Sequence, residues 1–187
     1  MRVVGGKVKG RRLVSFTHLS VRPTSDMVRE AVFNVLGQDL SWAGRTLDLF
    51  AGTGAMGIEA LSRGANDAVF VDNDVKALAI VRKNLALCGF TERSKVLKKD
   101  ATEAVKGLSV EGESFDLIFM DAPYSDVSLT NESLGAVSRS SILKEGGILV
   151  VEAAKRNASM IDAAGFDVVK EKTYGDTAVR FLKKKDV

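Results

Sequence analysis

Two short stretches combine residue types that can bind and orient small molecules. The first is Asp121-Ala122-Pro123-Tyr124, which follows the apolar run 115–120. An exocyclic amine on a nucleobase is a poor nucleophile because its lone pair delocalises into the ring. The Asp121 carboxylate and the Ala122 carbonyl can each accept one of its hydrogens. Pro123 ends the strand, and Tyr124 can stack on a base taken out of its helix. Alone, the tetrapeptide would read as a strand-end turn.

The second stretch is a glycine-rich loop, 48-DLFAGTGAMG-57. Gly52 and Gly54 allow a sharp turn and a close approach of backbone to ligand. The spacing matches the dinucleotide fingerprint G-x-G-x-x-G, which is a weak signal by itself. Asp48, inside the strand end, can meet a cationic or hydroxyl-bearing ligand instead. The loop also has no phosphate-binding lysine and no P-loop pattern, which argues against a dinucleotide.

Three further acidic residues follow later strands. Asp72 lies about twenty residues beyond the glycine loop, where an acid binds ribose hydroxyls. This position suits both a nicotinamide dinucleotide and S-adenosylmethionine. Asp74 is a candidate helix N-cap. Asp100 can accept from an adenine amino group or cap the helix that follows it, and the residues favour neither role.

The elements that must position these residues alternate between short apolar runs and helical patterns. This alternation predicts an α/β fold with a mostly parallel sheet covered by helices on both faces. The turn 174–177 is so short that the last two strands must be an antiparallel hairpin, which gives seven strands in all. The expected strands are 46–50, 68–71, 95–98, 115–120, 147–151, 166–173 and 177–183, and the expected helices are 55–63, 74–88, 101–108, 127–140 and 155–164.

The first 22 residues are basic and contain no acid. A local basic patch favours a polyanionic partner. The charges alternate with apolar residues such as Val3 and Leu13, which predicts an ordered strand pair, with Gly5-Gly6 or Gly10 at a turn. A helix should then start near Pro23, be capped by Thr24 or Ser25 and stop at Gly37. The basic residues are Arg2, Lys7, Lys9, Arg11, Arg12 and Arg22.

Composition narrows the class of protein. The chain has 187 residues, 45% of them hydrophobic, and a net charge of +3. No run of eighteen apolar residues could span a membrane, and the N-terminus does not resemble a signal peptide. The single cysteine, Cys88, excludes an internal disulfide and a multi-cysteine zinc site, and we expect no metal. These features predict a soluble, cytoplasmic protein.

Six stretches spread along the chain belong together: 5-GGKVKGRRL-13, 22-RPTSDMVREAVFNVLG-37, 47-LDLFAGTGAMGIEALSRGA-65, 69-VFVDND-74, 121-DAPY-124 and 174-YGDT-177. In combination they resemble the small bacterial 16S ribosomal RNA guanine-N2 methyltransferases, a family of class I S-adenosylmethionine-dependent enzymes. The resemblance covers essentially the whole chain. It implies a Rossmann-like class I methyltransferase fold with a small N-terminal β extension. It divides the chain into an RNA-binding arm and helix, 1–40, and a methyltransferase domain, 41–187.

The resemblance also implies roles for individual residues. The family motif Asp-Pro-Pro-aromatic maps onto Asp121, Ala122, Pro123 and Tyr124 as the catalytic set. Ala122 departs from the pattern: its carbonyl is retained, but the residue before it is less restricted than before a proline. The implied S-adenosylmethionine-binding residues are Asp48, Phe50, Gly52, Gly54, Asp72, Asn73, Asp100 and Ala101. The implied RNA contacts are Lys7, Lys9, Arg11, Arg12, Arg22 and Arg29, largely to phosphates.

The function that follows is methyl transfer from S-adenosylmethionine to guanine N2 in 16S rRNA, naked or within an assembling or assembled small ribosomal subunit. The chain is expected to be a monomer. One alternative keeps the chemistry and changes the target to adenine N6 in DNA or RNA. A protein-glutamine methyltransferase is less favoured, because that family's tetrapeptide begins with Asn. The alternative from another class is a non-enzymatic RNA-binding module that retains the fold, for which Ala122 is the one sequence hint.

Overall fold

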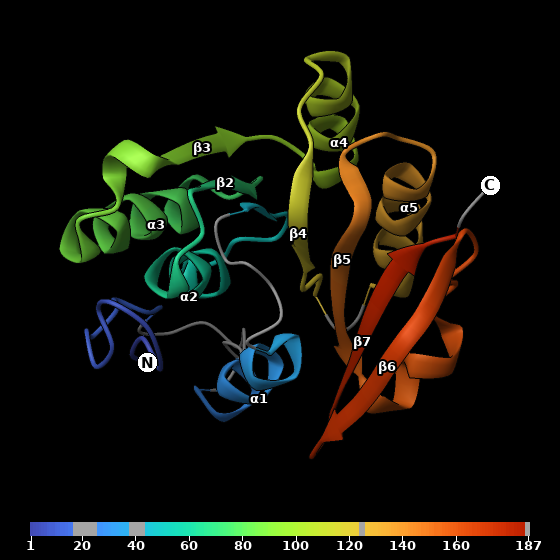
Figure 1. Ribbon diagram of the computed structural model, residues 1–187, viewed down its shortest axis with the longest axis horizontal. Coiled ribbons are helices and arrows are strands. Elements are labelled where there is room, and N and C mark those ends of the chain that lie inside the picture. The colour runs from blue at the N-terminus through green and yellow to red at the C-terminus, as the bar shows by residue number, and fades with distance from the viewer. Residues whose placement is uncertain (17–25, 38–43, 124–125, 186–187) are drawn as a thin grey trace.

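The computed structural model describes residues 1–16, 26–37, 44–123 and 126–185, which build a seven-stranded sheet between helices (Figure 1). The strand order is β3-β2-β1-β4-β5-β7-β6. The first five are parallel, and β7 lies antiparallel between β5 and β6. The predicted parallel sheet with a terminal antiparallel hairpin is confirmed. The strands are β1 (Arg45–Asp48), β2 (Asp67–Asp72), β3 (Ser94–Lys98), β4 (Phe115–Met120), β5 (Leu143–Ala154), β6 (Phe166–Tyr174) and β7 (Thr177–Lys184).

Helices cover both faces of the sheet. Those of the described ranges are α1 (Asp26–Leu36), α2 (Ala55–Arg63), α3 (Val75–Cys88), α4 (Ala101–Val110) and α5 (Val127–Ser138), with short 3-10 helices η1 (Thr91–Arg93) and η2 (Lys155–Met160). Within these ranges no helix has the length and apolar character needed to cross a membrane.

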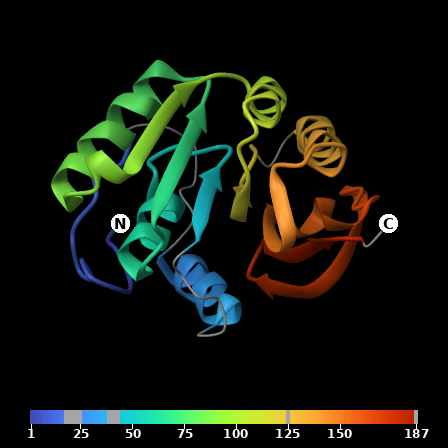
Figure 2. The same ribbon diagram turned by 45° about the horizontal axis from the view of Figure 1, so that its top comes forward.

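Two apolar cores fix the layers. Because side chains alternate along a strand, Ala68 and Phe70 of β2 face a core shared with α1, α2 and α3, whereas Val69 and Val71 face a core shared with α4 and α5. In Figure 2 the arrows of β1, β2 and β3 (cyan to yellow-green) point the same way, so their carboxyl ends lie at one edge.

The segment after β5 differs from the prediction. The expected helix 155–164 is only the 3-10 helix η2. Side chains satisfy the backbone groups that would otherwise continue a helix: Asn131 donates to the Met160 carbonyl and accepts from the Asp162 N–H, at 3.0 and 2.9 Å. The Asp162 carboxylate accepts from the Ala164 N–H at 2.9 Å. These bonds divert the chain toward β6.

The N-terminal arm, residues 1–16, lies beside α2 (Figure 1). The predicted strand pair is reduced to one antiparallel bridge, Arg2 to Arg12. Gly6 and Gly10 have φ angles of +74° and +84°, so the expected turn glycines are present. Backbone hydrogen bonds between Val3 and Arg11 and between Leu13 and Met1 accompany this bridge, and side chains of α2 and α3 bind other backbone groups of the arm. The expected helix start at 23–25 lies outside the described residues.

Candidate active site

Three acid-bearing strand ends meet at one edge of the sheet. β1 lies between β2 and β4, and Asp48 pairs in register with Phe70 and Phe119. The strand order changes direction between β1 and β4, and in open α/β sheets ligands bind beyond the carboxyl ends of strands at this point. Asp48, Asp72 and Asp121 therefore border a common region, as the sequence predicts.

The glycine loop is a tight backbone turn between β1 and α2. Gly52 and Gly54 have φ angles of +53° and +79°, which L side chains rarely adopt. The Gly54 N–H donates to the Ala51 carbonyl at 2.6 Å and closes the turn. Gly57 has a different role: a Cβ there would lie 2.4 Å from the Phe70 ring, so its absence lets α2 pack closely against β2.

Asp48, at the end of β1, binds a free backbone N–H in the first turn of α2. The N-cap residue of this helix is Gly54, which has no side chain to cap it. The Asp48 carboxylate instead accepts from the Gly57 N–H at 3.1 Å. The side chain is only 2% exposed. Burial, with a smaller effect of nearby Asp72, raises the pKa of Asp48 to about 7. Asp48 thus has a protein partner, and its cofactor role stays a prediction.

Asp72 holds the glycine loop against β2. One carboxylate oxygen accepts from the Gly52 N–H at 2.8 Å, and the other from the Asp74 N–H at 2.9 Å. A carboxylate has about four acceptor sites. Because Asp72 is only half-buried, it can still accept from a ligand hydroxyl. Asn73 is exposed beside it, and Asp74 caps α3 through the Lys76 N–H, as predicted.

Asp100 is the N-cap of α4. One carboxylate oxygen accepts from the Thr102 N–H at 2.8 Å and from the Thr102 hydroxyl at 2.7 Å. The Thr102 hydroxyl bond is the main reason that the pKa of Asp100 is lowered. Asp100 therefore caps α4, which is one of its two predicted roles, and its contact with an adenine stays a prediction. The Ala101 side chain is buried in the core beneath α4, so only its backbone can contact a ligand.

β4 ends at Met120, so Asp121, Ala122 and Pro123 follow the end of the strand, as predicted. Asp121 is half-buried, Ala122 is buried and Pro123 is exposed. The Pro123 carbonyl accepts from the Asp126 N–H at 2.8 Å, and the Asp126 carboxylate caps α5 through the Leu129 N–H. These bonds tie Pro123 to the first turn of α5. Tyr124 lies outside the described residues.

One predicted RNA contact is wrong. The side chain of Arg29 is 0% exposed, so it cannot present its charge to a phosphate. It forms ion pairs with Asp26 at 2.9 Å and with buried Glu59 at 3.5 Å, and it donates to the Arg2 carbonyl. A sequence signal was available: Arg29 lies at helical spacing with the apolar residues that follow it in α1, Val32, Phe33 and Leu36.

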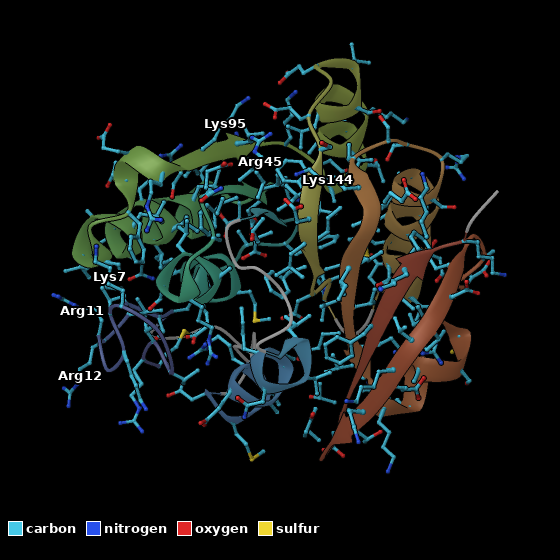
Figure 3. The ribbon with its side chains drawn as sticks, in the orientation of Figure 1. Lys7, Arg11, Arg12, Arg45, Lys95 and Lys144 are labelled. Carbon is cyan, nitrogen blue, oxygen red and sulfur yellow. The ribbon has the colours of Figure 1, made fainter. Side chains whose placement is uncertain are left out.

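The other predicted RNA contacts lie on the arm. Lys7, Lys9, Arg11 and Arg12 are all exposed, and within the described ranges no ion pair involves them. Figure 3 places Lys7, Arg11 and Arg12 together at the arm, far from the labelled bases at the amino ends of the strands. Arg22 lies outside the described residues.

The basic side chains at the amino ends of the strands form ion pairs with acidic residues. Arg45 pairs with Asp67 at 2.9 Å and with Glu113. Lys144 pairs with Asp116 at 2.8 Å, and Lys95 with Glu111 at 3.3 Å (Figure 3). The uncompensated positive charge of these two groups is therefore on the arm, and a polyanion would be attracted to that side.

Buried polar side chains that the sequence did not single out hold the arm. Glu59 accepts from the Val4 N–H at 2.8 Å. The Ser62 hydroxyl accepts from the Val8 N–H at 3.1 Å and donates to the Gly5 carbonyl at 2.6 Å. Both residues project from α2. Among the described residues no group of His, Cys, Asp and Glu could hold a metal ion.

The sheet order, the antiparallel β7 and the glycine loop at the switch point define a class I methyltransferase fold. The solved structure of "Putative methyltransferase yhhF from Escherichia coli" has a TM-score of 0.83 and 29% identity, and the match covers 99% of this chain and 98% of that chain.

Residues 1–183 match the family described as "Conserved hypothetical protein 95", and this chain belongs to that family. A protein of Bacillus subtilis (strain 168) named "Putative rRNA methyltransferase YlbH" is 39% identical over 99% of this chain and 100% of its own length. "Ribosomal RNA small subunit methyltransferase D" of Escherichia coli (strain K12) is 30% identical over 98% of this chain and 90% of its own length.

Proposed function

We propose that this chain transfers a methyl group from S-adenosylmethionine to the exocyclic N2 of a guanine in 16S ribosomal RNA. The observation that carries the proposal is the set of three acidic strand ends, Asp48, Asp72 and Asp121, around one glycine loop. Asp72 organises the loop on one side, and the Asp121 tetrapeptide leaves β4 on the other. The E. coli relative, which matches over nearly its whole length, is named for methylation of small-subunit rRNA.

The residues at the loop fit the methyl donor. A Cβ at Gly52 would have just the Phe50 carbonyl at 4.0 Å as a neighbour, so there is open space beside the loop backbone. Asp72 retains acceptor capacity for ribose hydroxyls. When bound, S-adenosylmethionine supplies a methyl group activated by its sulfonium sulfur. The proposed contacts are Asp48, Phe50, Gly52, Gly54, Asp72, Asn73, Asp100 and Ala101, with Asp100 and the Ala101 backbone near the adenine.

The tetrapeptide orients the acceptor. The Asp121 carboxylate and the Ala122 carbonyl each accept one hydrogen of the guanine amine, which holds the nitrogen and favours its pyramidal form. The nitrogen forms the new N–C bond as the donor S–C bond breaks, and its surplus proton leaves through the Asp121 carboxylate. Tyr124 stacks on the base. The chain needs no covalent nucleophile, because alignment and proximity supply the rate.

The arm binds the RNA. Phosphates are contacted by five residues: Lys7, Lys9, Arg11, Arg12 and Arg22. Residues 1–40 therefore form the part that binds RNA, and residues 41–187 form the methyltransferase domain. Phosphate contacts make the affinity fall with added salt. We further propose that the protein acts in the cytoplasm as a monomer.

A methyl-transfer assay with tritiated S-adenosylmethionine tests the function. The purified chain is incubated with 30S subunits, naked 16S rRNA or duplex DNA, and the labelled nucleoside is identified after digestion. We expect label in N2-methylguanosine from one of the two RNA substrates and none in DNA.

The other outcomes separate the alternatives. Label in N6-methyladenine would replace the guanine assignment with the adenine one. Cofactor binding without label in any substrate would support the non-enzymatic RNA-binding module. In that case Ala122→Pro, which restores the family motif, tests whether the missing proline is the cause.

A further inference from the structure

Asn84 of α3 is a fully buried polar residue that the proposed chemistry does not use. Its side chain is 0% exposed, and its helix neighbours Val81, Leu85 and Cys88 belong to the core. A buried amide needs partners for both its donors and its acceptor. Asn84 finds all of them, and they belong to two segments far apart in the sequence.

The first segment is the end of the arm. The Asn84 side-chain oxygen accepts from the Val14 N–H at 2.8 Å, and its amide nitrogen donates to the Val14 carbonyl at 3.0 Å. The side chain thus replaces the neighbouring strand that Val14 lacks. Val14 follows the basic residues Arg11 and Arg12, so Asn84 fixes the arm close to its exposed charges.

The second segment is the glycine loop. The same amide nitrogen donates to the Thr53 carbonyl at 2.9 Å. Thr53 lies between Gly52 and Gly54, and the Gly52 N–H is the group that Asp72 holds. The Thr53 hydroxyl makes a second link to the arm, because it donates to the Met1 sulfur at 3.4 Å.

We infer that Asn84 is a positioning residue that couples binding of cofactor at the glycine loop to binding of RNA by the arm. The inference rests on the proposed function. A planar amide cannot follow a shift of Thr53 and keep both Val14 bonds. A buried donor left without a partner is costly, so loop and arm are held to one arrangement. Such coupling must be reciprocal: RNA tightens cofactor binding by the factor by which cofactor tightens RNA binding.

Calorimetry on the full chain measures the coupling. The affinity for S-adenosylhomocysteine is determined with and without saturating 16S rRNA transcript. For the wild-type chain we expect the transcript to lower the dissociation constant by about fivefold or more, within the usual range for coupled sites. For Asn84→Ala we expect the ratio to fall to about one.

Ser62→Ala is the matched control. Ser62 bonds the arm at Gly5 and Val8 but makes no side-chain bond to the glycine loop. We expect weaker RNA binding with the coupling ratio retained. If both variants keep the ratio, or both lose it equally, Asn84 has no special role and the inference is refuted.

Hydrogen exchange of the wild-type chain gives a readout that does not depend on folding of a variant. S-adenosylhomocysteine should slow exchange of the Val14 amide about fivefold. Binding without protection at Val14 and with a ratio of one would refute the coupling and leave the proposed function intact. Failure of the wild-type chain to bind S-adenosylhomocysteine would overturn both.

Discussion

Replacing Asp48 with asparagine should stabilise the fold at alkaline pH. Asp48 is buried, and burial raises its pKa from the ordinary 3.8 to about 7. The folded state therefore favours the protonated form. The stability that the protonated Asp48 carboxyl contributes is fully present below pH 3.8 and is lost as the pH rises toward 7. Each pKa unit is worth about 1.36 kcal/mol, so the ionised carboxylate costs about 4 kcal/mol of the free energy of unfolding at pH 8.

The difference between two pH values isolates this effect. At pH 5 the cost is about 1.7 kcal/mol, because the carboxyl is still protonated in the folded state and mostly ionised in the unfolded one. An asparagine retains an oxygen that can accept from the Gly57 N–H. The gain of Asp48→Asn over wild type should then be about 2.5 kcal/mol larger at pH 8 than at pH 5. Any fixed cost of the amide cancels.

Urea denaturation at the two pH values gives the measurement. Asp116→Asn is the matched control. Burial alone would raise the pKa of Asp116, but hydrogen bonds from Lys144 and from the Arg45 N–H lower it. Asp116 is thus ionised in both states at pH 5 and pH 8, and the effect of its replacement should be the same. Equal effects of Asp48→Asn at both pH values would refute the burial argument.

Three further predictions follow from the geometry. Gly57→Ala should lower the free energy of unfolding by about 1–2 kcal/mol in urea, because clash with the Phe70 ring outweighs the gain in helix propensity. Asp121→Ala should lower the methyl-transfer rate about 100-fold or more, a loss comparable to that of one preorganised hydrogen-bonding group in an active site, while S-adenosylhomocysteine affinity in calorimetry is retained. The double variant Arg11→Ala/Arg12→Ala should weaken RNA binding and reduce the slope of log affinity against log salt by about 1.5.

Matched variants control these measurements. A Cβ at Gly107 would meet just the tip of Lys99 at 3.1 Å, so Gly107→Ala should be neutral or stabilising. Lys95→Ala, in the neutralised group, should leave the salt slope unchanged. Equal loss of rate and cofactor affinity in Asp121→Ala would make Asp121 a structural residue.

Local signals made the sheet and the glycine loop predictable. The bounds of α2 follow from Gly54 before it and Gly64 after it, both with positive φ. The bounds of β4 follow from a run that is apolar except for Asp116 and that ends before Asp121. The prediction of a helix over 155–164 was wrong, because side-chain hydrogen bonds from α5 compete there with the backbone bonds of a helix. Nothing in the local sequence indicates that Asn131 will supply them.

Asn84 shows a similar limit for a residue within a helix, because its burial also depends on a segment far away in the sequence. In sequence, a charged or amide residue on a helix predicts a face toward water. Here the arm covers that face, and the backbone groups of the arm that its own pairing leaves unbonded, such as those of Val14, need partners. Polar side chains of α2 and α3, among them Ser62, supply those partners. Their burial therefore depends on where the arm lies, which the sequence around each residue does not indicate.

The two helices that bind the arm, α2 and α3, also begin at the proposed cofactor site. α2 begins at the glycine loop, and α3 begins just beyond Asp72. The helices that orient the arm are thus the ones whose first turns form the proposed cofactor site. A change that tilts either helix would displace the arm charges and the loop together. We therefore expect Asn84→Ala, beneath the arm, to affect RNA and cofactor binding jointly, because Asn84 bonds both the arm and the glycine loop. Substitution of an exposed arm residue such as Arg12 should affect RNA binding alone.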